Sequence, residues 1–303
     1  MKIIKRRVRK NRKKSNVLLI LFVFLLIVLL IFLVLKVQAK DLKRIAVYSW
    51  NIDDIEINKL QEMARKLDIN ALYQYIKIDN LKSEKIKKLL EGLKSKKINF
   101  YLLQGTPEQA YESDVTSMKT VIDKVVNFNQ ENGNIIKGIV WDVEFYLEEK
   151  QYQNENKAKA FEYYYQNMKI LYEYAKGKKI EIVQVIPYWI DTVIGNTELE
   201  AFIRDTCDSI EVMNYYKEKS IEHIKNEYMY AQKYDKSIVT ISELQEEDGI
   251  AVTEKITFYS DGLENCHKNV EKILEYYNYE KFGYAYHYYK YLKILYENGY
   301  LRN

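Results

Sequence analysis

The sequence has few of the residues that mark several common protein classes. Its 303 residues include only ten glycines, two prolines, two cysteines and three histidines. This composition excludes a collagen-like or Pro-rich low-complexity chain and a small scaffold held by disulfides. No Gly-x-Ser-x-Gly, P-loop or dinucleotide-binding motif occurs, and no histidines have the spacing of a zinc site. We therefore expect neither a metal nor another cofactor.

What the sequence does contain is unevenly distributed. Apolar residues make up 48% and charged residues 30%, with 47 Lys and Arg against 43 Asp and Glu. Nine of the basic residues lie between Lys2 and Lys14, where there is no acid, so the chain from Val17 onward is net negative. A basic surface is the electrostatic footprint of nucleic-acid binding. The main part of the chain therefore gives no reason to expect a nucleic-acid partner.

An apolar run follows the basic head. Val17–Leu35 is nineteen consecutive apolar residues, about 28 Å as a helix and enough to cross a bilayer. Because the flank rich in Lys and Arg stays in the cytoplasm, we expect a single-pass cell-membrane protein whose C-terminal part is extracellular. The predicted parts are a head at 1–16, an anchor at 17–37, a juncture at 38–43 and a domain at 44–303. The alternative is a signal peptide cleaved near Val37-Gln38-Ala39.

The chain from residue 44 onward alternates short apolar runs with stretches of helical periodicity. Eight candidate strands result: Arg44–Trp50, Ala71–Ile76, Asn99–Gln104, Ile135–Trp141, Ile180–Tyr188, Ser209–Tyr215, Ser237–Glu243 and Phe282–Tyr288. Between them, apolar residues recur every three or four positions, as in Ile86, Leu89, Leu90 and Leu93, or Phe161, Tyr165, Met168 and Leu171. Eight strand–helix units in about 260 residues predict an α/β fold, the (β/α)8 TIM barrel. A doubly wound sheet is the alternative, although its Gly-rich first turn is lacking.

The two cysteines are expected to remain unpaired. Cys207 precedes the sixth strand, whereas Cys266 follows the seventh, which places them at opposite ends of a barrel. Cysteines that far apart cannot form a disulfide. We expect both to be small buried residues.

The active site of a (β/α)8 barrel lies where its strands end, so the residues that end each strand are the candidates. Asp142 and Glu144 end the fourth strand, and alternation places both on the face of Gly138 and Val140. Two carboxylates at one barrel mouth repel each other, so one should hold a proton at neutral pH. A protonated carboxyl beside an ionised one suits glycoside cleavage. A solvated acidic loop is the plainer alternative.

Other strand ends supply partners for these two carboxyls. Tyr215 ends the sixth strand and could bind an acyl oxygen, and Glu243 ends the seventh as a third carboxylate. Flat aromatic faces stack against sugar rings. The candidates for substrate binding are the aromatic and polar residues at the remaining strand ends: Trp50, Gln104, Tyr188, Trp189, Asn214 and His287.

Two short segments resemble glycoside hydrolase family 18, the chitinase-like barrels. Gly138–Glu144 is similar to the end of its Asp-Gly-x-Asp-x-Asp-x-Glu motif, and Met213-Asn214-Tyr215 to its Met-x-Tyr-Asp motif. Lys137 and Val140 stand where the first motif has its first two aspartates, and Tyr216 replaces the aspartate of the second. The resemblance implies that Glu144 is the general acid. It also implies that Asp142 and Tyr215 hold the substrate's 2-acetamido group as nucleophile.

These observations predict a membrane-anchored, extracytoplasmic glycoside hydrolase acting on a cell-surface or matrix polysaccharide that contains N-acetylated amino sugars. Within this class, a second mechanism uses Glu144 as acid/base and Glu243 as covalent nucleophile. The rival from another class is an inactive barrel that binds glycans or acts as a scaffold. The expected partners are thus a polysaccharide and, through residues 17–35, a lipid bilayer.

Overall fold

The computed structural model describes residues 22–26, 43–148, 152 and 157–300. It divides the chain into two compact units, Met1–Lys43 and Arg44–Asn303. In the first unit, residues 22–26 are helical with exposed side chains, and the rest of the predicted anchor lies outside the described residues. Among the described residues, no helix is both long and apolar enough to cross a membrane.

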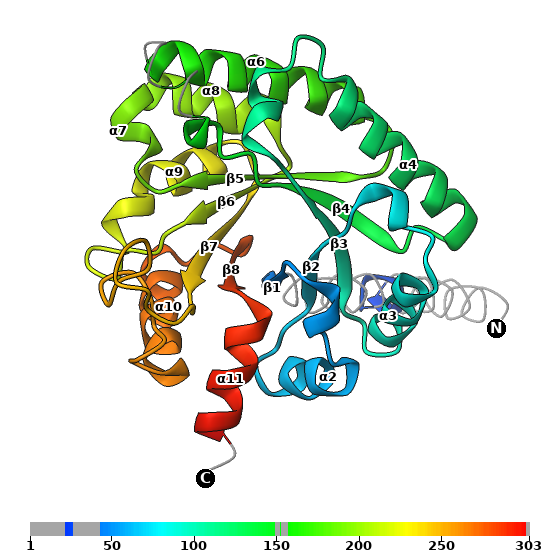
Figure 1. The fold of residues 1–303 in the computed structure, drawn as a ribbon, viewed down its shortest axis with the longest axis vertical. Coiled ribbons are helices and arrows are strands. Elements are labelled where there is room, and N and C mark those ends of the chain that lie inside the picture. Colours follow the sequence, from blue (N-terminus) through cyan, green and yellow to red (C-terminus); the bar gives the residue numbers. More distant parts are fainter. Residues whose placement is uncertain (1–21, 27–42, 149–151, 153–156, 301–303) are drawn as a thin grey trace, which may run out of the picture. The chain divides into compact units, whose positions relative to one another are not determined.

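Eight parallel strands close into a barrel in sequence order, which confirms the predicted (β/α)8 fold (Figure 1). The strands are β1 (Ile45–Ser49), β2 (Ala71–Tyr75), β3 (Asn99–Gln104), β4 (Ile136–Trp141), β5 (Glu181–Pro187), β6 (Ser209–Met213), β7 (Ser237–Glu243) and β8 (Phe282–His287). Strand β8 pairs with β1, and this closure rules out the open doubly wound sheet. Each strand lies within two residues of its predicted bounds.

Helices follow the strands and surround the barrel (Figure 1). The α-helices are α2 (Ile57–Lys66), α3 (Glu84–Lys94), α4 (Thr116–Asn132), α6 (Lys157–Ala175), α7 (Ile190–Ile194), α8 (Asn196–Thr206), α9 (Lys225–Lys233), α10 (Leu263–Tyr277) and α11 (Tyr289–Tyr300). Short 3-10 helices lie at η1 (Ile52–Asp54), η2 (Ile78–Asn80), η3 (Pro107–Tyr111), η4 (Phe145–Leu147) and η5 (Glu222–Ile224).

The predicted helix faces are largely correct. In α3, the four predicted apolar residues are buried, while Lys87 and Lys88 between them face solvent. Tyr165 of α6 is a partial correction, because Tyr164 takes the buried position and Tyr165 is half-exposed with its hydroxyl bound to Asp205.

Side chains alternate between two cores along each strand. One core fills the space between sheet and helices and includes Ile139, Trp141 and Val143 of the fourth strand region. The other fills the inside of the barrel and includes Val140, together with tyrosines from β1, β2 and β3. The predicted orientation of the residues leading to Asp142 is therefore confirmed.

The two cysteines are buried and unpaired, as predicted. Cys207 lies directly before β6, and Cys266 lies in the first turn of α10. Burial raises the pKa of both thiols to about 12, so both stay protonated and unreactive near neutral pH.

Candidate active site at the mouth of the barrel

The backbone at the end of β4 is held closely against the end of β3. The Asp142 N–H donates to the Gln104 carbonyl at 2.7 Å. Gly105, the residue after Gln104, has a φ of +144°. A Cβ at this position would lie 2.1 Å from the Asp142 carbonyl oxygen. Any larger residue at 105 would displace this backbone. The absence of a side chain at Gly105 therefore allows the close backbone contact that positions Asp142 at the mouth.

Glu144 stands two residues further on, directly before η4. Its Oε1 accepts a hydrogen bond from the Tyr146 hydroxyl. The Trp189 ring packs edge-on against Tyr146, with ring centroids 4.9 Å apart. Glu144 is partly exposed, so it is oriented by protein groups and still open to a ligand.

Asp142 lies in an environment that favours its protonated form. Burial, followed by the negative charge of Glu144, raises the pKa of Asp142 to about 7, with a further contribution from Glu211 and an opposing one from His287. Its Oδ1 is buried and accepts no hydrogen bond from any described residue. Asp142 therefore keeps its proton to a higher pH than an ordinary aspartate.

This raised pKa predicts how stability depends on pH. Because the folded protein binds the Asp142 proton more tightly than the unfolded chain, the stabilisation is complete below about pH 4 and is lost as the pH rises through about 7. We expect the urea midpoint to fall less between pH 5 and pH 8 in Asp142→Asn than in the wild type. Asp68→Asn, at an exposed position, is the control. Equal falls in the wild type and Asp142→Asn would contradict the raised pKa.

Glu243, His287 and Trp50 form a chain of hydrogen bonds across β7, β8 and β1. Glu243 Oε2 lies 2.7 Å from His287 Nδ1, and Trp50 Nε1–H donates to His287 Nε2 at 3.1 Å. The Trp50 contact makes Nε2 an acceptor, so His287 donates to Glu243 from Nδ1. The predicted mouth residues on these three strands therefore lie together.

Both carboxylate oxygens of Glu243 are occupied. Oε1 accepts the backbone N–H groups of Leu244 at 2.9 Å and Gln245 at 2.8 Å, and Oε2 also accepts the Gln245 side-chain amide at 3.2 Å. Burial alone would raise the pKa of Glu243, but His287 and the Gln245 hydrogen bonds lower it below its ordinary value. Glu243 is thus a buried, ionised and fully paired carboxylate.

Tyr215 lies among these acids. Its ring centroid is 5.7 Å from that of His287. Burial, followed by the charges of Glu243, Asp142 and Glu144, raises the pKa of its phenol well above the ordinary value. No described residue hydrogen-bonds to its hydroxyl, which remains a neutral donor for a ligand.

The structure does not bring Gln104 and Asn214 into the mouth. Gln104 ends β3 and Asn214 directly follows β6, and in each case the alternation of the preceding residues turns the side chain towards the helices. Gln104 donates its amide to the Ile76 carbonyl at 2.8 Å, and Asn214 donates to the Ser220 carbonyl at 2.7 Å. These amides fix loops, which corrects their predicted role in substrate binding.

Tyr188 and Trp189 separate at the end of β5. Trp189 packs on Tyr146 beside Glu144, as described above. Tyr188 instead stacks on His223, with centroids 4.3 Å apart, and lies near Tyr216. Tyr188 therefore lies in a second aromatic group, made with His223 and Tyr216, rather than with the carboxyls.

A buried polar network inside the barrel was not anticipated. Glu211 of β6 accepts the hydroxyls of Tyr48 and Tyr73, each at 2.5 Å, and is fully buried. Arg44 lies 3.9 Å from Glu211 and pairs with Glu181. Burial raises the pKa of Glu211 to about 7, although Arg44 and the two tyrosines oppose this. The signal in the sequence was the alternation Glu211, Met213, Tyr215, which puts an acid inside the barrel.

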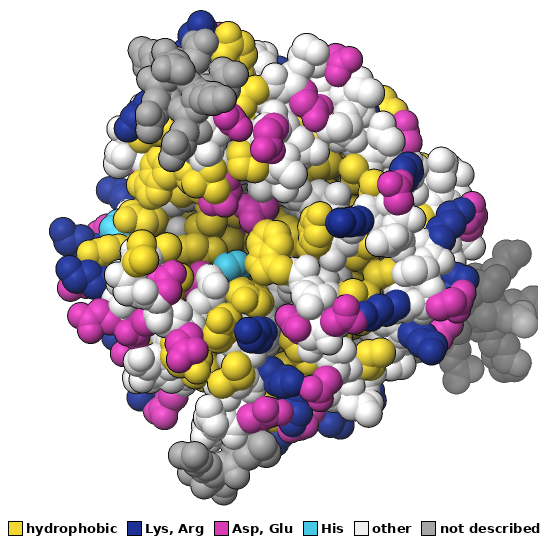
Figure 2. Space-filling view, viewed as in Figure 1, with side chains coloured by type: hydrophobic (Ala, Val, Ile, Leu, Met, Phe, Trp, Pro, Cys, Tyr) yellow, Lys and Arg dark blue, Asp and Glu magenta, His cyan; other side chains and the backbone are white. Residues whose placement is uncertain are grey.

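The mouth combines these groups in one hollow. Figure 2 shows hydrophobic side chains gathered around a hollow near the middle of the face, with acidic and histidine side chains beside them. In the part of the chain that the structure describes, no group of three His, Cys, Asp or Glu side chains could hold a metal ion. The arrangement offers two neighbouring carboxyls, one of them with a raised pKa, together with a phenol donor and aromatic faces.

Comparison with known proteins gives matches in structure alone. No family model and no curated protein matches the sequence. A class V chitinase from Pseudomonas fluorescens is 9% identical, with 82% of this chain and 96% of that chain covered and a TM-score of 0.53. The spore cortex-lytic enzyme SleL of Bacillus megaterium is 11% identical, with coverage of 80% and 70% and a TM-score of 0.52.

A D-psicose 3-epimerase from Clostridium cellulolyticum matches to a similar degree. It is 10% identical, with 81% of this chain and 85% of that chain covered and a TM-score of 0.50. Enzymes of different chemistry share this architecture, so the function must be argued from the site. The chain has a (β/α)8 fold like that of chitinases and other glycoside hydrolases.

Proposed function

We propose that this protein is a glycoside hydrolase that cleaves a cell-surface or matrix polysaccharide containing N-acetylated amino sugars. The observation that carries the proposal is the pair of carboxyls at the mouth, Asp142 with a pKa raised to about 7 and Glu144 held by Tyr146, beside aromatic side chains. An acid that can protonate a leaving oxygen, next to a carboxylate that can stabilise positive charge, is what glycoside cleavage requires.

Glu144 is the general acid in this mechanism. Glu144 donates a proton to the glycosidic oxygen while the substrate's acetamido oxygen attacks the anomeric carbon and the bond from that carbon to the leaving oxygen breaks. Asp142 is then the carboxylate that pairs with the acetamido N–H and stabilises the cyclic cation, and the Tyr215 hydroxyl donates to the acetamido oxygen. Water next opens the cation, and Glu144 takes back the proton. These steps need no acceptor beyond the pair itself.

Glu243 takes a positioning role rather than that of nucleophile. Its oxygens already accept four hydrogen bonds, and its side chain is 3% exposed. A carboxylate held in this way has no free lone pair aimed at a sugar. The negative charge of Glu243 instead holds the proton of His287 on Nδ1. His287 then accepts the Trp50 N–H at Nε2 and so orients Trp50 at the mouth.

Glu243→Gln separates the two mechanisms. We expect turnover to fall by at most about tenfold, because the amide keeps part of the His287 contact, whereas loss of a nucleophile removes a factor of about 10³ or more. The measurement is release of reducing ends from chitin-type oligosaccharides. Gln245→Ala is the control, because it removes one hydrogen bond to Glu243 without changing the charge. A fall of a thousandfold in Glu243→Gln would establish Glu243 as the nucleophile instead.

We further propose that residues 17–35 anchor the protein in the cell membrane with the barrel outside the cell. The uninterrupted apolar run and the nine basic residues before it support this. Such a location would give the mouth access to wall or matrix polymers. Protease treatment of intact cells tests it, since an extracellular barrel is degraded while the N-terminal head is protected.

The function is tested with the full chain on a panel of polymers. We expect reducing ends from N-acetylated amino-sugar polymers and none from xylan or cellulose. Val140, in place of a motif aspartate, favours the rival function, a barrel that binds glycans without cleaving them. Binding to the same polymers with no turnover at any pH between 4 and 8 would establish that rival.

A further inference from the structure

The two ends of the barrel carry opposite charges. In the described segments that lead from each strand to the next long helix, eighteen residues are acidic and five are basic. In the described segments that lead into the strands, nine are basic and four are acidic. The mouth is therefore negative, and the opposite end, where the strands begin, is positive.

The positive charge is concentrated where β3, β4 and β5 begin. We call Lys94, Lys96, Lys97, Lys137 and Lys179 the basic rim. All five side chains are exposed, and none forms an ion pair with a described residue. By contrast, the neighbouring Lys176 and Lys178 are paired with acids. The basic rim is thus a group of cations with no counter-charge from the described protein.

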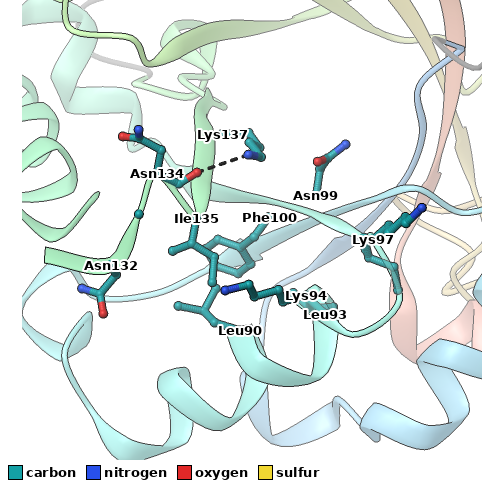
Figure 3. A pocket seen from close by; sticks show the side chains of 12 residues that line it. Leu90, Leu93, Lys94, Lys97, Asn99, Phe100, Asn132, Asn134, Ile135 and Lys137 are labelled. Carbon is teal, nitrogen blue, oxygen red and sulfur yellow. Dashed lines mark hydrogen bonds between the residues drawn. The ribbon is translucent and has the colours of Figure 1, made fainter. Parts of the chain in front are cut away.

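A cavity opens within the basic rim. It has a volume of about 230 Å³ and lies between the ends of α3 and α4 and the starts of β3 and β4. Figure 3 shows Leu90, Phe100 and Ile135 gathered at its centre, with amine and amide side chains around them, among them Lys94, Lys97, Lys137, Asn99 and Asn134. Lys137 uses one donor on the Asn134 carbonyl, at 3.2 Å. The remaining ammonium and amide donors can bind an anionic group.

We propose that the basic rim docks on the surface of an anionic phospholipid bilayer, with the cavity accepting a phosphate-bearing head group. Clusters of lysines are attracted to anionic lipid surfaces. The apolar centre of the cavity suits the part of a head group that joins the acyl chains. With the basic rim on the bilayer, the acidic mouth faces away from it, towards the polysaccharide.

Chain topology favours a membrane over a soluble polyanion. Strand β1 begins at this same end of the barrel, so the chain before Ile45 leaves from the basic end. Nine residues separate Ile45 from Leu35, the end of the proposed anchor, and they span about 30 Å when extended. The inference thus rests on the anchor in the proposed function, but not on its catalytic chemistry.

Hydrogen exchange of the full chain in lipid nanodiscs tests the proposal. The discs contain either phosphatidylcholine alone or phosphatidylcholine with phosphatidylglycerol. We expect amides in 95–98, 133–135 and 176–180 to exchange at least fivefold more slowly in the anionic discs, and this protection to disappear at 0.5 M NaCl. Equal exchange in both discs overturns the proposal.

Matched variants show whether these lysines cause the protection. Each lysine near an anionic surface strengthens association by about fivefold, so three contribute about a hundredfold. Lys94→Gln/Lys97→Gln/Lys137→Gln should lose the protection. Lys217→Gln/Lys219→Gln/Lys255→Gln makes the same change in charge near the mouth and should keep it. Equal behaviour of the two triple variants contradicts a role for the basic rim.

Two further outcomes are separable. Protection of the same segments by soluble polyphosphate, with none from anionic discs, overturns the lipid assignment in favour of a soluble polyanion. If the protein fails to co-purify with phosphatidylcholine discs, the membrane anchor is contradicted. Amide hydrogen exchange of that protein with anionic discs added still tests whether the basic rim docks on the bilayer. Neither result depends on polysaccharide cleavage.

Discussion

Glu144→Gln is expected to lower turnover on amino-sugar polymers by about 10² to 10⁴, the range that a general acid contributes. The amide has the shape of the carboxyl, so it can still accept the Tyr146 hydroxyl that binds Glu144, but it has no proton to deliver to the leaving oxygen. Substrate affinity should change little, because the lost proton donation stabilises the transition state and not the bound substrate. The measurement is initial rates of reducing-end release, with circular dichroism to verify folding.

A matched variant controls for charge in the same loop. Glu148→Gln removes one negative charge four residues after Glu144. Among the described hydrogen bonds, the Glu148 side chain forms none with Asp142 or Tyr146. We expect its rates to remain within about twofold of the wild type. Undiminished activity in Glu144→Gln removes Glu144 as the acid and with it the proposed mechanism.

Arg44→Met is expected to cause a large loss of stability. Arg44 is the cation beside Glu211 and Glu181, and its guanidinium lies 4.8 Å from the centroid of the Tyr101 ring. Methionine keeps the apolar volume but removes the cation that opposes the raised pKa of Glu211, so this fully buried carboxyl has no counter-charge when it is ionised. Removing one partner of a buried ion pair costs about 3 to 5 kcal/mol. For a domain of this size, the expected fall in Tm is about 10 °C.

Two companion variants make this prediction specific. Arg65→Met removes an exposed arginine of α2 and should leave Tm unchanged. Arg44→Met/Glu211→Gln removes the uncompensated charge as well, so it should recover part of the loss. If Arg44→Met unfolds at the wild-type temperature, the network does not support the barrel.

The fold could be predicted because each strand is a short apolar run between helices of regular periodicity. Parallel strands covered on both faces are apolar along most of their length, and their number and spacing suffice for a closed barrel. The predicted ends of β6 were too long because Asn214 and Tyr215 are still β-like in composition, although pairing stops at Met213. The β-propensity of the residues cannot locate the position at which a strand stops pairing with the adjacent strands.

The candidate site was predictable only in part. Alternation correctly placed the residues before Asp142, because it is a property of the backbone alone. The same alternation turns Gln104, at the end of β3, and Asn214, directly after β6, towards the helices and away from the mouth. Glu211 is not a strand-end residue, because it lies in the middle of β6. Its partners, Tyr48 and Tyr73, come from distant strands that only closure of the barrel brings together.

The abundance of tyrosine also has a structural explanation at three positions. Tyr48, Tyr73 and Tyr101 fill the inside of the barrel with large apolar rings, and their hydroxyls donate to the buried Glu211 and the half-buried Glu181. Phenylalanine at positions 48 and 73 could fill the same volume but would remove both hydroxyl donors to the buried Glu211. Composition alone could not distinguish this use from a general bias of the sequence.

The proposed acid catalysis is tested most directly by the pKa of Asp142, measured by carbon-13 NMR of its side-chain carboxyl in the folded protein, with Asp142→Asn assigning the resonance. We expect a midpoint of about 7 that falls when Glu144→Gln removes the neighbouring charge. A midpoint near 4 that does not respond to Glu144→Gln would mean that the mouth holds no proton at neutral pH, and the proposed acid catalysis would be wrong.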